Sequence, residues 1–93
     1  KPPMKTSPPI LKNLFRPSAF LEVKHTILRA KDQADLHQAR KMIDRYIFDI
    51  CPKNMREEQQ ADLIYILKYQ VGELLLNGEK LSSLEIAELM IKK

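Results

Sequence analysis

The chain of 93 residues contains no tryptophan, only two glycines and a single cysteine. One cysteine cannot form an intrachain disulfide, so we expect a reducing, intracellular location, most simply the cytoplasm. Two isolated glycines cannot supply the clustered glycines of phosphate or dinucleotide loops. The longest dense apolar stretch, 63–67, is five residues, whereas a membrane span needs about 20. No secretory signal is present either.

Charge is distributed unevenly along the chain. Residues 1–31 carry seven basic residues and one acidic residue, a net +6, whereas residues 32–93 carry nine basic and eleven acidic residues, a net −2. A basic amino-terminal third on a near-neutral body favours contact with an anionic partner, either nucleic acid or an acidic protein face. The alternative is that the basic residues only keep this segment in solution.

Proline is also concentrated, with five of the six prolines in residues 1–17. Proline removes amide donors and restricts the residue before it, so this segment is predicted to be an extended, basic arm. Its apolar residues 10–15 could dock on the body of the protein or on a partner. The predicted domain organisation is therefore an arm over 1–17 and a helical domain over 18–93.

The rest of the chain is rich in helix-forming residues. We expect a first helix over about 18–31, a second after an N-cap at Asp32, a third after an N-cap at Asn54 and a fourth from Ser82 or Ser83. Pro52 should stop the second helix near Ile50, and Gly78 should end the third after Asn77.

Apolar residues at helical spacing predict one buried stripe on each helix. The predicted core positions are Phe20, Val23, Ile27 and Ala30; Leu36, Ala39, Ile43, Tyr46, Ile47 and Ile50; Leu63, Ile64, Leu67, Val71, Leu74 and Leu75; and Leu84, Ala87, Leu89 and Met90. Short connections force neighbouring helices into antiparallel packing. The predicted fold is all-α, a small antiparallel bundle of three longer helices and a short C-terminal helix.

The predicted third helix has a second apolar stripe, formed by Tyr65, Tyr69, Gly72 and Leu76. This stripe is roughly opposite the first. It is either covered by the first helix, the fourth helix or the arm, or it contacts a partner. Gly72 would be tolerable in a helix if another backbone approached closely there.

We therefore interpret the chain as a non-enzymatic protein–protein interaction module, an adaptor, inhibitor or regulatory subunit. Its partner would be another protein or a second copy in a homodimer. Because aromatic residues dominate interface energies, Tyr65, Tyr69 and Leu76 form the first predicted contact set and Phe15 and Phe48 the second.

The alternative function is nucleic-acid binding through phosphate contacts, which would be sensitive to salt. The basic residues that would make these contacts are Lys5, Lys12, Arg16, Lys24, Arg40, Lys41 and Arg45.

Catalytic, cofactor and metal sites are not predicted. His25, His37 and Cys51 are the only soft ligand candidates, and their separations match no zinc motif. Paired carboxylates such as Asp32 and Asp35 stand at predicted helix starts, where negative charge stabilises the helix. The chain is therefore not expected to be an enzyme.

Residues 81–90, LSSLEIAELM, resemble the first helix of helix-turn-helix DNA-binding proteins. The turn and recognition helix that would read bases are absent from this sequence. Residues 75–86 are also similar to the closing helices of membrane-anchored AAA+ zinc proteases, but HExxH is missing. Neither resemblance implies a function for this chain.

Overall fold

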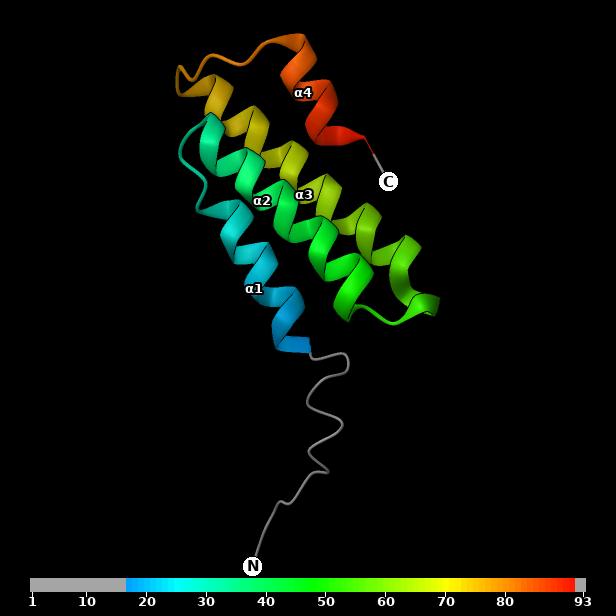
Figure 1. Ribbon diagram of the computed structural model, residues 1–93. Helices are drawn as coiled ribbons and strands as arrows, with labels where there is room; N and C mark the ends of the chain where they lie inside the picture. The colour runs from blue at the N-terminus through cyan, green and yellow to red at the C-terminus, as the bar shows by residue number, and fades with distance from the viewer. Residues whose placement is uncertain (1–16, 92–93) are drawn as a thin grey trace, which may run out of the picture.

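The computed structural model describes residues 17–91, and all regular structure within them is helical (Figure 1). The four α-helices are α1 (Pro17–Leu28), α2 (Gln33–Arg45), α3 (Arg56–Leu76) and α4 (Ser83–Met90). A π-helical turn, η2 (Tyr46–Ile50), extends α2, and a 3-10 turn, η3 (Lys53–Met55), precedes α3. The predicted all-α fold of three longer helices and one short helix is confirmed. The predicted arm lies outside the described residues, except for Pro17, where α1 begins.

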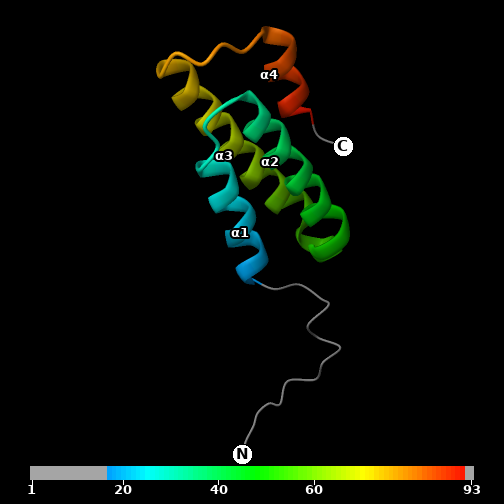
Figure 2. The ribbon, with the colours of Figure 1, turned by 60° about the vertical axis from the view of Figure 1, so that its left-hand side comes forward.

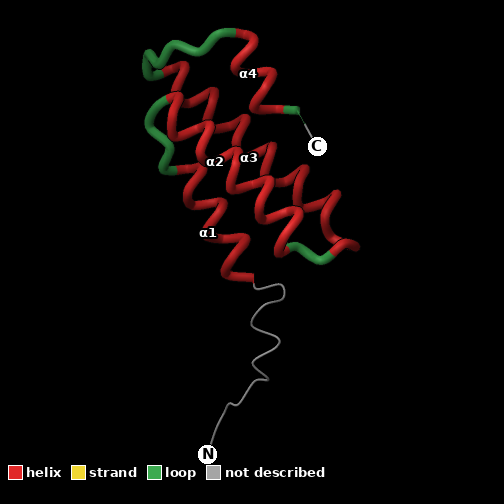
Figure 3. Tube along the Cα trace, in the orientation of Figure 1, coloured by secondary structure: helices red, strands yellow, loops and turns green. Residues whose placement is uncertain are grey.

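The three longer helices alternate in direction and lie side by side (Figures 1 and 2). α1 packs against both α2 and α3, while the short α4 packs against α3 and α2 near the C-terminal end of α3. The loops between these helices are short, apart from the longer connection to α4 (Figure 3). The core consists of one buried side-chain cluster: Ala19, Val23, Ile27, Ala30, Leu36, Ala39, Ile43, Tyr46, Ile47, Cys51, Leu63, Leu67, Val71, Leu74 and Leu89.

The connection between α1 and α2 is fixed by side chains on both sides of it. Asp32 caps α2 as predicted, since its carboxylate accepts a hydrogen bond of 2.9 Å from the amide of Asp35. α1 ends at Leu28, earlier than predicted. The buried side chain of Gln70 on α3 donates a hydrogen bond of 2.9 Å to the carbonyl of Ala30, which satisfies a backbone acceptor just beyond the helix.

The start of α3 differs from the prediction. Asn54 lies inside the 3-10 turn, where the amide of Met55 donates to the carbonyl of Pro52, and no side chain caps the helix. Asn54 therefore does not occupy the N-cap position. A different residue joins the two helices here: Arg56 donates from Nε to the carbonyl of Ile47 at 2.9 Å and from a terminal nitrogen to the carbonyl of Phe48 at 3.1 Å.

The end of α3 and the start of α4 follow the sequence closely. Gly78 has φ of +97°, and the amides of Gly78 and Glu79 donate to the carbonyls of Leu75 and Leu74, which is the Schellman arrangement. Ser82 and Glu85 form the predicted reciprocal capping box.

The buried face of α4 is the predicted one only in part. The predicted positions Leu89 and Met90 are buried or pack against the core, whereas Leu84 and Ala87 are exposed, and Ile86 packs against the core in their place. α4 has only eight residues, so its apolar positions extend around much of the helix and the spacing alone does not select a face. Packing against α2 and α3 selects it.

Candidate protein-interaction surface

The second apolar stripe of α3 is exposed. Tyr65, Tyr69 and Leu76 are 74%, 58% and 83% exposed, and Gly72 between them is exposed as well. Successive helical residues are rotated by about 100°, which places this stripe on the side of α3 opposite its buried face. We call Tyr65, Tyr69, Gly72 and Leu76 the outer face of α3. The described helices do not cover it, so the sequence alternative in which α1 or α4 buries it is excluded.

Gly72 is not required by the packing within the chain. A Cβ atom added at this position would meet nothing within 4 Å. Glycine in a helix interior costs about 1 kcal/mol relative to alanine. From the sequence, Gly72 would be tolerable if another backbone packed closely against it. No described element of this chain does so. The outer face therefore has a bare strip of backbone, without a side chain, at Gly72 between Tyr69 and Leu76.

The inner face of α3, opposite the outer face, packs in the core and so fixes the orientation of the outer face. Leu63, Leu67, Val71 and Leu74 are buried, so the helix is anchored along its length. Leu75, predicted as a core residue, is 42% exposed at the border between the two faces. Leu75 follows Leu74 by one residue, which rotates its side chain away from the centre of the buried stripe. The predicted stripe did not account for this rotation.

Phe48, in the second predicted contact set, lies in the π-helical turn that extends α2 and is 46% exposed. The Arg56 guanidinium carbon lies 5.5 Å from the centroid of its ring, a cation–π arrangement. Phe48 is therefore near the beginning of α3, whereas Leu76 ends that helix. The structure does not bring the two predicted sets together. Phe15, the other member of the second set, lies outside the described residues.

The basic residues predicted to contact phosphates are only partly available for that role. Arg40 is 7% exposed, pairs with Asp44 at 2.8 Å and donates to the carbonyl of Ile91 at the end of α4. It therefore links α2 to α4, and its guanidinium does not face solvent. Lys41 and Arg45 are exposed on α2, and Lys24 is partly buried on α1. The arm residues Lys5, Lys12 and Arg16 lie outside the described residues.

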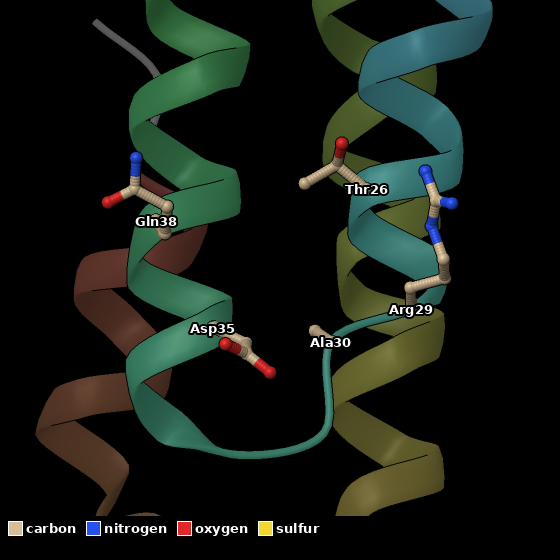
Figure 4. A pocket seen from close by; sticks show the side chains of 5 residues that line it. All are labelled: Thr26, Arg29, Ala30, Asp35 and Gln38. Atoms are coloured by element: carbon tan, nitrogen blue, oxygen red, sulfur yellow. The ribbon is translucent and has the colours of Figure 1, made fainter.

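A groove between α1 and α2 contains two hollows. The first, about 220 Å³, is lined by Thr26, Arg29, Ala30, Asp35 and Gln38. In Figure 4 Thr26 on α1 and Arg29 just beyond its end lie across the groove from Asp35 and Gln38 on α2. The Asp35 carboxylate already accepts the amide of Lys31 at 2.9 Å. The second hollow, about 180 Å³, lies further along the same helices and is bordered by Val23, Met42 and Ile50.

Cys51 is buried in a small polar cluster at the end of α2. Its thiol donates to the side-chain oxygen of Gln59, which also accepts from the Tyr46 hydroxyl. Burial raises the pKa of the Cys51 thiol and raises the pKa of Tyr46 to about 12. Since the thiolate is the nucleophile, a raised pKa makes Cys51 a poor one at neutral pH.

Within residues 17–91 there is no group of three or more histidine, cysteine, aspartate or glutamate side chains that could hold a metal ion. Nor does this part of the chain contain a helix that is both long and apolar enough to cross a membrane. Comparison of the chain with protein-family models, with curated proteins and with solved structures gives no significant match.

Proposed function

We propose that this protein is a non-enzymatic interaction module, an adaptor, inhibitor or regulatory subunit, that binds a protein partner through the outer face of α3. The observation that carries the proposal is the exposure of two tyrosines and a leucine in one row on a helix whose other face is fixed in the core. Tyrosine is enriched at protein interfaces because its ring supplies contact area while its hydroxyl tolerates water.

The size of the outer face indicates how strongly it can bind. Covering the exposed parts of Tyr65, Tyr69 and Leu76 would remove roughly 400 Å² of surface from water, given that a buried aromatic side chain contributes about 150–250 Å². Specific, stable protein–protein interfaces bury about 1,200–2,000 Å² in total over both partners. The outer face alone therefore supports weak association, and tight binding requires flanking contacts.

Site-specific photo-crosslinking in cells that express the protein tests this proposal. Replacing Tyr69 by photoreactive benzoylphenylalanine keeps an aromatic ring at the proposed contact. We expect light-dependent adducts with a protein, which mass spectrometry identifies. The matched control carries the same probe at Leu21, a half-exposed apolar residue on α1. The proposal fails if the Tyr69 probe gives no adduct, or if both probes give the same adducts in the same yield.

A further inference from the structure

The spacing of the outer face indicates which partner it fits. Tyr65, Tyr69, Gly72 and Leu76 are separated by steps of four, three and four residues, the spacing by which one helix meets another along a shared seam. This order of steps reads the same in both directions along the helix. A second copy of α3 running antiparallel therefore presents the same spacing to the first.

Side-chain sizes match in that antiparallel register. With a two-fold axis midway between Tyr69 and Gly72, Tyr69 lies across from the partner's Gly72, and Tyr65 lies across from the partner's Leu76. Each Tyr69 ring would then pack on the exposed backbone at the partner's Gly72, where, apart from the adjoining residues and backbone of α3 itself, nothing lies within 4 Å of a Cβ position. A parallel pair would instead place glycine against glycine and leave a void, which packed interfaces avoid.

Charges favour the same register. Glu58 and Asp62 continue the seam toward the start of α3 and are exposed. In a parallel pair each would face its own copy, and like charges facing each other across a seam are destabilising. In the antiparallel pair, the position across from Asp62 would be another acidic residue, Glu79, but Glu79 lies beyond the end of α3 and its carboxylate accepts the amide of Gln33 at 3.1 Å. The helical overlap therefore includes the apolar turns and ends before Glu58 and Asp62.

We propose that the occupant of the outer face is a second copy of this chain, packed antiparallel along α3 in a two-fold symmetric dimer. This inference rests on the proposed function and adds the identity of the partner. The interface is isologous, so each contact occurs twice. Because the overlap is limited to about three helical turns, the dimer dissociates on dilution, and its population depends on protein concentration.

Sedimentation velocity of the full chain over a wide concentration range is the first test. We expect a reversible monomer–dimer equilibrium, and Gly72→Leu should weaken the dimer roughly tenfold or more because its side chain fills the space that the Tyr69 ring needs. Leucine forms helices well, so this variant should stay folded, as circular dichroism will show. Leu21→Ala, which removes an exposed leucine of α1, is the control and should leave the equilibrium unchanged.

Cysteine cross-linking tests the register. In a Cys51→Ser background, Tyr65→Cys and Leu76→Cys proteins are prepared separately and then mixed under mild oxidation. The antiparallel register predicts a disulfide between the two different variants and little cross-linking within either alone. A parallel pair predicts the reverse, which would overturn the register. The register is equally overturned if Gly72→Leu associates as tightly as the wild type.

Three further outcomes would remove the second copy as the occupant. If the wild type is a monomer at every concentration, the dimer is overturned, whereas Tyr69 adducts with a different protein would still support the proposed function. If only a variant lacking residues 1–16 dimerises, the arm occupies the outer face in the full chain. If neither dimer nor Tyr69 adduct is found, both proposals fail.

Discussion

On α3, the inner face is built from four aliphatic side chains together with the buried glutamines Gln60 and Gln70, and the outer face from two tyrosines, a glycine and a leucine. Both faces look apolar in the sequence, yet Leu67 is fully buried and Tyr65 is largely exposed. The chemical difference is informative, because a tyrosine can be wet in the monomer and still contribute a large contact area when covered. Hydrophobic spacing therefore identifies both faces, and residue type helps to tell the core from the candidate interface.

The largest expected difference in stability is between two leucine-to-alanine substitutions, one on each face of α3. Leu67→Ala should lower the free energy of unfolding by about 2–5 kcal/mol, because it opens a cavity in the core. Leu76→Ala should change it by less than about 0.5 kcal/mol in the monomer, because that side chain is already in water. Urea unfolding followed by circular dichroism at low protein concentration measures both. Equal losses would mean that the outer face is covered in the monomer.

A second pair extends the comparison to charged residues on α2. Arg40→Gln should lower the free energy of unfolding by about 1–3 kcal/mol, since it leaves Asp44 and the Ile91 carbonyl without their buried donor. Arg45→Gln should have an effect near zero, because Arg45 is exposed. Thermal unfolding of both variants decides this. If Arg40→Gln is neutral, the link between α2 and α4 does not stabilise the fold.

The two glycines should respond to alanine with opposite signs. Gly72→Ala should stabilise the monomer by about 0.5–1 kcal/mol, because alanine favours the helix and its Cβ meets no neighbour. Gly78→Ala should destabilise it by about 1 kcal/mol, because φ of +97° is strained for a residue with a side chain. Chemical unfolding at low concentration gives both values. A destabilising Gly72→Ala would indicate that the monomer already packs against this position.

Tyr69→Gln, like Arg45→Gln, is expected to have one of the smallest effects on monomer stability. The change should stay within about 0.5 kcal/mol, because Tyr69 is mostly exposed and glutamine is a good helix former. Urea unfolding measures it, and the same protein should give less dimer in sedimentation than the wild type. Loss of folding would place Tyr69 in the core instead.

Local signals in the sequence were sufficient for much of the fold. Asp32, Gly78 and Ser82 each carry a cap or turn preference that depends on one or two neighbouring residues, and all three predictions are confirmed. The start of α3 was not predictable from Asn54, because a 3-10 turn precedes the helix and Arg56 instead satisfies carbonyls of the preceding helical turn. The contacts of Arg56 join two different helical elements, so they cannot be predicted from the residues next to Asn54.

The candidate site was predicted only in part, for a related reason. Spacing identified Tyr65, Tyr69 and Leu76, but whether they are covered depends on where the other helices pack. The sequence does not predict the burial of Arg40 either. Asp44 four residues later provides the spacing of a helical ion pair, but such pairs form on exposed helix surfaces as well. Residue type alone grouped Arg40 with the exposed Lys41 and Arg45, and only tertiary packing separates them.

The proposed contact between two copies of this chain is the outer face of α3. The most direct measurement is the concentration dependence of backbone amide chemical shifts in solution NMR. A dimer through the outer face predicts progressive shifts at Tyr65, Tyr69, Gly72 and Leu76 as concentration rises, with little change on α1. Shifts confined to another surface, or no shifts at any concentration, would contradict it.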